Sequence, residues 1–273
     1  MSPYVRDDTL SGRSILVIGG TSGFGFGVVT AILAHPSADI TIHIASSRQE
    51  SLHKTKTRLH EMFPSAGARI KLHKIDLTSS KLESDLKHLL ENCTDNGAVP
   101  LDHIVFTAGD HVPFHGVKDI TQDMITDSQK TRLVAPLLTA SILDANPDKY
   151  MSISRSSSII LTGGIRALKP DANWPLFTVV LSAIEGAARS LAMSLTPIRV
   201  NCVAPGAVWT EMFEKYFNSH LELESVKQYL ESKILFGTMG EPDEVAEAYI
   251  YLMKDRFVTG QTIRSDGGML IRE

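Results

Sequence analysis

The stretch ILVIGGTSGFG, residues 15–25, joins an apolar run directly to a glycine-rich turn, and a helical stretch follows from near Phe26. A strand, a glycine turn and a helix in this order form a dinucleotide site. Glycine permits the tight turn and lets the backbone approach a phosphate closely. The first N–H groups of the helix and its dipole then face the negative charge. The stretch therefore predicts a nucleotide cofactor held through its pyrophosphate.

Apolar, β-rich runs alternate with amphipathic stretches along the rest of the chain. We predict seven strands, at residues 14–18, 40–45, 70–75, 103–106, 158–161, 200–203 and 261–263. Most intervening segments are long enough for right-handed crossover helices, which makes the fold class α/β: one doubly wound domain, residues 1–273, with a parallel sheet flanked by helices.

Residues 211–236 interrupt the alternation of strands and helices with mixed aromatic and charged residues. They follow the sixth predicted strand, and an insertion there lies above the carboxyl ends of the strands, where ligands bind in such sheets. We therefore expect residues 211–236 to form a substrate lid.

Composition limits the classes of partner. The chain has 273 residues, 43% hydrophobic content and a formal net charge of −4, which suits one large core and argues against nucleic acid. Cys93 and Cys202 have no CxxC or His-rich context and are expected to be reduced residues of the core or of helices, so we predict no metal site. No segment approaches the roughly 18 apolar residues of a membrane span. The expectation is a soluble, cytoplasmic protein.

Five ordered motifs span essentially the whole chain and resemble those of the short-chain dehydrogenase/reductase family. They are IGGTSGFG at 18–25, IDLT at 75–78, TAG at 107–109, IRVNCVAPGAVWT at 198–210 and TGQTIRSDGG at 259–268. The resemblance implies a Rossmann-type domain that binds a nicotinamide cofactor. It assigns residues to the turn at the pyrophosphate, to the contact with the adenine, to the cofactor cleft and to the segment beside the nicotinamide. The residues it implies are Gly19, Thr21, Ser22, Gly23, Phe24, Gly25, Asp76, Leu77, Ala108, Gly109, Pro205, Gly206, Val208 and Thr210.

The tip of the second predicted strand bears on the choice of cofactor. An NAD enzyme places a carboxylate there to receive both ribose hydroxyls, whereas this chain reads Ala45-Ser46-Ser47-Arg48. Arg48 can offer paired, charge-assisted hydrogen bonds to a 2′-phosphate, and Ser46 and Ser47 can add weaker ones. The sequence favours NADP(H). A merely solvated Arg48 is the alternative, because Gln49 and Glu50 follow it.

The positions that carry catalysis in the family are altered. Its ordinary members use a serine and a Tyr-x-x-x-Lys pair, in which the lysine lowers the pKa of the tyrosine that exchanges a proton with the substrate. Alignment on IRVN places Phe177 and Leu181 at the Tyr and Lys positions, and Arg132 at a position that is Asn in the family. Residues 177–191 contain neither tyrosine nor lysine. The serine position falls within residues 162–164.

Reduction of a carbonyl is thereby disfavoured, because the alkoxide it generates needs an acid or an oxyanion donor. An iminium ion is already cationic, and hydride addition turns it into a neutral amine without a proton donor. The chain resembles an atypical branch of the family in this respect: the fungal reductase/Diels–Alderases of malbrancheamide and paraherquamide biosynthesis, which work on prenylated indole alkaloids. That resemblance implies an NADPH-dependent oxidoreductase of secondary metabolism, with an intramolecular [4+2] cyclisation as a further activity.

Two residues are the candidates for catalysis. Arg132 is expected to hydrogen-bond an amide or oxygen of the substrate, and Asp171 to stabilise an iminium and accept a proton. An ion pair with Asp127 or another helix acid is the alternative for Arg132, and a solvated turn after Pro170 is the alternative for Asp171. The aromatic residues Trp174, Trp209 and Phe177 are candidates for a wall against an indole-containing small molecule.

Two other functions stay open at this point. One is a redox-silent cyclase or isomerase that keeps NADP as a structural ligand. The other is a ketone reductase whose acid has moved to His111, His115 or Tyr216. The apolar helices predicted near residues 128–143 and 178–193 form dimer contacts in the family, so a homodimer or homotetramer is expected.

Overall fold

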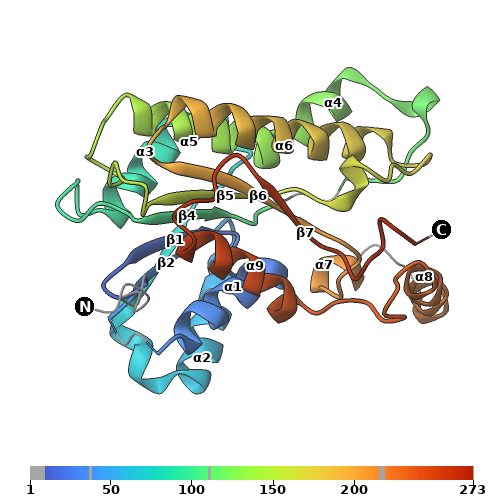
Figure 1. Ribbon diagram of the computed structural model, residues 1–273, viewed down its shortest axis with the longest axis horizontal. Coiled ribbons are helices and arrows are strands. Elements are labelled where there is room, and N and C mark those ends of the chain that lie inside the picture. The colour runs from blue at the N-terminus through green and yellow to red at the C-terminus, as the bar shows by residue number, and fades with distance from the viewer. Residues whose placement is uncertain (1–9, 37–38, 110–111, 215–218, 273) are drawn as a thin grey trace.

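Seven parallel strands form one sheet in the order β3-β2-β1-β4-β5-β6-β7 (Figure 1). The computed structural model describes residues 10–36, 39–109, 112–214 and 219–272. The strands are β1 Ser14–Ile18, β2 Thr41–Ser46, β3 Ile70–Lys74, β4 His103–Phe106, β5 Ser158–Thr162, β6 Arg199–Pro205 and β7 Thr262–Ser265. All seven predicted strands are confirmed, with ends displaced by at most two residues.

Helices cover both faces of the sheet, which confirms the doubly wound α/β class. The helices α1 Gly23–Ala34, α2 Gln49–Met62 and α9 Pro242–Lys254 lie on one face, and α3 Leu82–Cys93, α5 Ala135–Asp144 and α6 Pro175–Ser194 lie on the other (Figure 1). Each layer has its own cluster of buried aliphatic side chains against the sheet. The strands read as continuous apolar runs because both of their faces are buried.

The first helix begins at Gly23, and not near Phe26 as the sequence suggested. Gly23 and Gly25 are poor helix formers, and they concealed the first turn of the helix from a propensity argument. The early start matters for function, since it places the unpaired N–H groups of the helix directly at the end of the glycine turn.

The helix predicted near residues 128–143 is three consecutive pieces. Helix α4, Gln122–Gln129, passes into a π-helical turn at Lys130–Val134, and α5 continues from there. Arg132 lies within this turn. A π-turn adds a residue to the helical repeat, and such turns are frequent at functional sites because they re-aim side chains.

Helix α6 is long and apolar enough to cross a membrane, judged by length and composition alone. The expectation that no segment reaches this level is therefore wrong. In the structure α6 packs on the sheet through Val180, Leu181, Ile184 and Ala188. A core helix of a globular domain passes the same test, and that is the place α6 occupies here.

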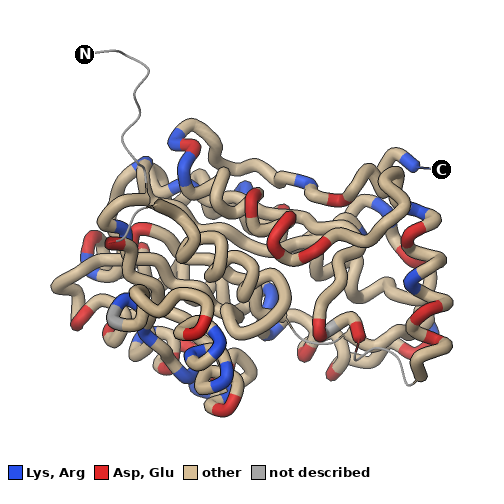
Figure 2. The backbone as a smooth tube through the Cα atoms, turned by 90° about the horizontal axis from the view of Figure 1, so that it is seen from below, with Lys and Arg blue, Asp and Glu red and all other residues tan. Residues whose placement is uncertain are grey.

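Charged residues of both signs are interspersed along the described chain, as Figure 2 shows with blue and red segments interleaved. At the centre of the sheet, β1 is paired with both β2 and β4. The connections from β1 and from β4 leave in opposite directions at this point, which opens a crevice at the carboxyl ends of the two strands.

Candidate active site

A cleft of about 580 Å³ lies at the carboxyl ends of the strands. It is lined by the glycine turn after β1, the tips of β2 and β3, the loop after β4, and the segment after β6. Of the predicted cofactor residues, those at the cleft wall are Gly19, Thr21, Ser22, Gly23, Phe24, Ser46, Ser47, Arg48, Asp76, Leu77, Ala108, Gly109, Pro205, Gly206, Val208 and Thr210. Arg132 and Asp171 line the same cleft.

The glycine turn has the geometry that a pyrophosphate needs. Gly19 has φ +96°, and a Cβ there would lie 2.4 Å from the backbone nitrogen of Ala108. Gly23 has φ +49°, and its N–H donates a 2.9 Å hydrogen bond to the carboxylate of Glu211. A carboxylate oxygen thus already occupies the anion position at the start of α1. The turn fits a phosphate group for the same physical reason.

Gly25 is the one predicted cofactor residue that does not line the cleft. It is buried beneath the turn, and a Cβ would lie 2.2 Å from the carbonyl oxygen of Gly19 and 2.4 Å from the hydroxyl of Thr107. Its expected place at the cofactor is therefore corrected. Gly25 lets α1 pack closely against the end of β1 and so supports the turn indirectly.

The end of β2 presents hydroxyl groups and one guanidinium to the cleft. The Thr21 hydroxyl donates a 3.1 Å hydrogen bond to that of Ser46, which joins the glycine turn to the strand tip. Ser47 and Arg48 are exposed and follow directly, and no acid stands among residues 45–48. These groups fit a 2′-phosphate better than two ribose hydroxyls.

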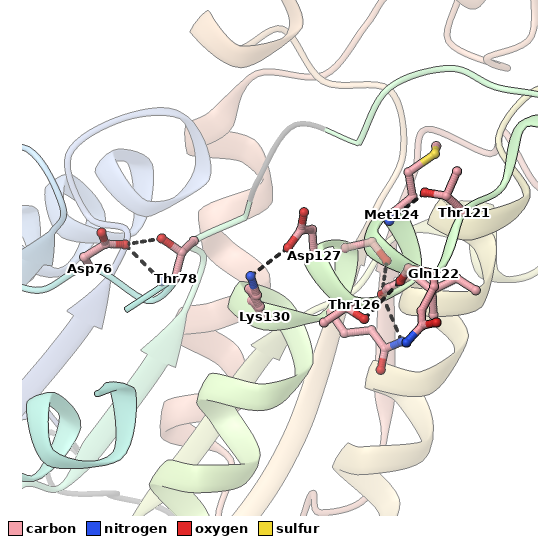
Figure 3. A network of polar contacts seen from close by, with 11 residues as sticks. Asp76, Thr78, Thr121, Gln122, Met124, Thr126, Asp127 and Lys130 are labelled. Atoms are coloured by element: carbon pink, nitrogen blue, oxygen red, sulfur yellow. Dashed lines mark hydrogen bonds and ion pairs between the residues drawn. The ribbon is translucent and has the colours of Figure 1, made fainter. Parts of the chain in front are cut away.

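Asp76 lies at the end of β3, where the adenine is expected. Its carboxylate accepts hydrogen bonds from the hydroxyl of Thr78 at 2.7 Å and from the backbone N–H of Thr78 at 2.9 Å (Figure 3). These two bonds hold the pKa of Asp76 below its usual range. The residue is therefore an ionised acceptor at neutral pH, fixed in orientation by the turn that follows it.

Phe177 and Leu181, at the positions expected to carry the tyrosine and lysine of the family, have side chains that cannot transfer a proton. Both line the cleft from α6, and Leu181 packs against Gly164, whose Cβ would lie 3.0 Å from a Leu181 methyl carbon. The Thr162 hydroxyl is buried, where it donates to the carbonyl of Phe106 and is 2.7 Å from the hydroxyl of Tyr249. Burial raises the pKa of Tyr249. Both hydroxyls are therefore bonded within the core, although Thr162 also lines the cleft.

Arg132 projects from the π-turn over the loop that follows β4. A Cβ added to Gly109 would overlap its guanidinium, so the glycine makes room for the charge. The guanidinium carbon is 5.5 Å from the centroid of the Phe177 ring. Asp127, the alternative partner that the sequence offered, is instead paired with Lys130 at 2.7 Å (Figure 3). The chain therefore holds Arg132 at the cleft by packing on a glycine and an aromatic face.

Asp171 lies in a turn, the alternative that the sequence left open, and it also lines the cleft. One carboxylate oxygen accepts from the backbone N–H of Asn173 at 3.0 Å, as in a turn. The other lies 3.7 Å from a guanidinium nitrogen of Arg166, and both side chains line the cleft. The sequence analysis missed Arg166, because a 3₁₀ turn at Ile165–Ala167 brings it back toward Asp171.

Three aromatic rings stack along one wall. Trp174 lies between Phe114 and Phe177, with ring centroids 4.4 and 4.3 Å away. The indole N–H of Trp174 donates to the carbonyl of Val112 at 2.7 Å, which fixes the ring orientation. Trp209 does not line the cleft, contrary to expectation. It packs on Phe213, and its N–H donates to Glu214.

The segment after β6 folds over the open side of the cleft. It contains α7 Glu211–Glu214 and α8 His220–Ser232, and it lines the cleft with Phe213, Val226, Tyr229 and Leu230. A small apolar cluster of Leu230, Ile234 and Met239 packs this segment on Ile165 and Met269. Whether residues 211–236 act as a lid stays a prediction, and residues 215–218 lie outside the described part of the chain.

Of the relocated acids considered from the sequence, only His115 lies among the described residues. It is buried and does not line the cleft. Its ring nitrogen Nδ1 is 3.3 Å from the carbonyl of Gly116. His111 and Tyr216 lie outside the described residues.

Comparisons with known proteins agree with this architecture. A family model described as an SDR-like Rossmann domain matches residues 7–272. The short-chain dehydrogenase/reductase malC of Malbranchea aurantiaca is 35% identical over 276 residues, covering all of both chains. The structure of the MalC reductase/Diels–Alderase from that organism is 34% identical, with TM-score 0.86 over 97% of this chain and 99% of the other. A small-chain dehydrogenase in complex with NADPH is 25% identical, with TM-score 0.74 over 95% and 99%.

Proposed function

The chain belongs to the short-chain dehydrogenase/reductase family, and from this premise we propose that it is an NADPH-dependent reductase of an iminium or similarly activated C=N substrate. The observation that carries the proposal is a cofactor cleft with Phe177 and Leu181 where proton transfer would need tyrosine and lysine. A substrate that is already cationic needs a hydride and no proton. The resemblance to a fungal reductase/Diels–Alderase supports a place in alkaloid secondary metabolism.

NADP(H) is the proposed cofactor. The glycine turn would hold its pyrophosphate, Asp76 its adenine, and Arg48 with Ser46 and Ser47 its 2′-phosphate. When bound, the nicotinamide would supply the hydride. The segment Pro205–Thr210 would hold that end, and a neighbouring structure that contains NADPH supports the assignment.

The side chains on the substrate side suit a cation that carries polar oxygens. Arg132 would orient an amide or carbonyl oxygen by hydrogen bonding, while Asp171 would face the iminium charge and stabilise it. Hydride addition then neutralises the substrate, so this step needs no proton donor. The neighbouring rings of Phe114, Trp174 and Phe177, tilted by 33° and 31° to one another, offer an apolar wall to an aromatic substrate.

The same cleft is proposed to hold an intramolecular [4+2] cyclisation. Asp171 would accept a proton on the way to the azadiene, and the aromatic wall with the lid would confine diene and dienophile. The similarity to the MalC reductase/Diels–Alderase favours this second activity. The lid, residues 211–236, belongs to the proposal because it closes the side of the cleft that would otherwise face water.

A homodimer or homotetramer is also proposed. Val179 and Met193 of α6 are 60% and 83% exposed, and Val134 and Leu137 before and within α5 are exposed as well. Apolar side chains on two neighbouring helices suit contact with a second copy. Sedimentation should therefore give a mass above that of one chain, and Val179→Lys should lower it. Cytoplasmic location remains a prediction.

The test of the reductase is a single-turnover assay with NADPH deuterated at its transferable position and a bicyclic or proline-derived iminium. Deuterium in the product would support hydride transfer without tyrosine or lysine. Clear NADPH binding with no transfer to any such substrate would favour the redox-silent cyclase. Turnover of simple ketones would favour the relocated acid.

A further inference from the structure

Two histidines and a cysteine from three different elements meet behind the edge of the sheet. His43 lies in β2, His73 in β3, and Cys93 ends α3. One ligand atom of each lies within 4.8 Å of the others. Nδ1 of His43 is 3.0 Å from Nε2 of His73, and the two rings are stacked with centroids 5.1 Å apart. His43 and Cys93 are buried, and His73 is half-buried.

The register of the strands explains the meeting. His73 is opposite Ala45 on β2, two residues beyond His43, so both histidines point to the sheet face that carries α3. Cys93 belongs to the buried cluster on that face. The cluster lies outside the cofactor cleft, whose wall includes none of these three residues.

The cluster offers two imidazole nitrogens and one thiol sulfur as ligand atoms. His43 and Cys93 are buried, so bulk water does not compete with their ligand atoms. A cation with a strong preference for sulfur and nitrogen would displace the thiol proton of Cys93.

We propose that His43, His73 and Cys93 bind one Zn²⁺ ion, a site separate from the cofactor cleft. Two nitrogens and one sulfur suit Zn²⁺ and not Mg²⁺ or Ca²⁺, which take oxygen ligands. Ligand atoms around tetrahedral Zn²⁺ are about 3.3–3.6 Å apart, so closing the present separations of up to 4.8 Å needs side-chain shifts of roughly 1 Å. Binding forms one Zn–S and two Zn–N bonds and releases one proton, from the thiol.

Solvent supplies the fourth ligand in this arrangement. A second cavity of about 400 Å³ borders His73 and is lined also by Asp85, His88 and Asn92. It gives the ion a route from the surface and leaves room for a water molecule on the open side of the metal. Three protein ligands with one open position are a known form of zinc coordination.

The ion would tie the edge of the sheet to the layer of helices. β3 is the outermost strand, paired only with β2. Zn²⁺ would join β3, β2 and the end of α3 through side chains, which adds to the backbone pairing of an edge strand. Its binding free energy would then add to the stability of the folded state.

The experiment uses the full chain, treated with a chelator, dialysed and titrated with ZnSO₄ by calorimetry in two buffers of different protonation enthalpy. The expected result is one equivalent bound, one proton released, and a higher melting temperature. Co²⁺ in place of Zn²⁺ should give a thiolate-to-metal charge-transfer band. His73→Gln and Cys93→Ala should each weaken Zn²⁺ binding by roughly 100-fold or more.

Matched controls separate the site from surface binding. His88→Gln removes an exposed histidine that borders the same cavity, and Cys202→Ala removes a buried cysteine elsewhere in the core. Both should bind Zn²⁺ as the parent does. The proposal is overturned by absence of stoichiometric binding, by unchanged binding in His73→Gln, or by equal loss in His88→Gln. His73 is half-exposed, so His73→Gln keeps the test valid even where Cys93→Ala fails to fold.

Discussion

The Glu211 carboxylate lies 2.9 Å from the backbone nitrogen of Gly23 and accepts its hydrogen bond at the first turn of α1. Gly23 belongs to the turn proposed for the pyrophosphate, and Glu211 begins α7 in the proposed lid. One contact therefore connects the cofactor turn to the segment that covers the cleft. A pyrophosphate in that turn would repel the carboxylate and displace it.

Removing the charge of Glu211 should strengthen cofactor binding. Glu211→Gln is expected to lower the Kd for NADPH by about 3- to 10-fold, because an anion near a helix N-terminus is worth about 1 kcal/mol. Fluorescence titration of NADPH measures the change. Glu214→Gln alters the same charge on the same helix and should have a smaller effect. Equal Kd values for Glu211→Gln and the parent would contradict competition at the turn.

Arg48 should determine whether the protein binds NADPH more tightly than NADH. Arg48→Ala is expected to weaken NADPH by about 10-fold or more and to leave NADH nearly unchanged, because only NADPH carries the 2′-phosphate. Titration of both cofactors tests this. Arg256→Ala, an exposed arginine beyond α9, serves as the control. A parallel loss for both cofactors would mean that Arg48 acts on the fold and not on the phosphate.

Arg132 and Asp171 should affect turnover without affecting the cofactor. Arg132→Gln and Asp171→Asn are each expected to lower kcat/KM for the iminium by about 100-fold, roughly 3 kcal/mol of transition-state stabilisation, with NADPH Kd within about twofold. Arg189→Gln and Asp127→Asn are exposed controls with the same chemical change. Unchanged turnover in both site variants would remove the two residues from the reaction.

Arg199 should be a major contributor to stability. Its buried guanidinium donates to the carbonyls of Arg155, Leu252, Met253 and Val258, two of which lie near the C-terminus of α9. Burial lowers the pKa of Arg199 to about 10, so it is charged at neutral pH. A lysine cannot reproduce the planar set of guanidinium donors. Arg199→Lys should therefore lower the free energy of unfolding, measured in urea, by about 2–4 kcal/mol. Arg189→Lys changes an exposed residue of α6 and should lower the free energy of unfolding by about 0.5 kcal/mol or less, as surface substitutions usually do.

His103 should make the protein sensitive to acid. Burial lowers the pKa of His103 to about 3 from an ordinary 6.5, with help from Arg199 and Arg13. The unfolded chain therefore takes up a proton first as pH falls through 6.5, and the free energy of unfolding decreases until about pH 3. His103 alone should contribute up to about 1.4 kcal/mol per pH unit to this slope, and His43 and His73, whose pKa values burial also lowers, add to it.

Denaturant unfolding at pH 7, 6 and 5 measures this slope. His103→Gln keeps a polar partner for Ser158, whose hydroxyl is 2.8 Å from the ring nitrogen Nδ1 of His103, and should flatten the dependence. His88→Gln changes an exposed histidine and should leave it as in the parent. Equal slopes in all three proteins would assign the acid sensitivity to other groups.

Linear patterns in the sequence predicted the fold and the cofactor side of the cleft well. The strands are recognisable in the sequence as continuous apolar runs, because both faces of the sheet are buried. The glycine turn, the hydroxyls of residues 46–47 and Asp76 each lie at the end of a strand or just after it. Carboxyl ends of parallel strands meet at one edge, so position along the chain was enough to gather them.

The substrate side was harder because its residues lie on turns of irregular geometry. A π-turn sets the direction of Arg132, and a short 3₁₀ turn returns Arg166 to Asp171. Trp209 packs against the apolar cluster of the segment after β6 and not into the cleft. Both surroundings are apolar, so the hydrophobicity of the residue does not predict which of them it occupies. The cluster of His43, His73 and Cys93 joins three distant segments, and its spacing matches no linear metal motif.

The packing of Leu181 limits what the cleft can hold. Its side chain is 1% exposed and touches Gly164, so the residue lines the cleft while most of it belongs to the hydrophobic core. Leu181→Lys would bury an ammonium group among apolar neighbours, at a cost of several kcal/mol. A lysine at this position is therefore incompatible with the present packing, and a proton relay built through it would require the surrounding core to be repacked.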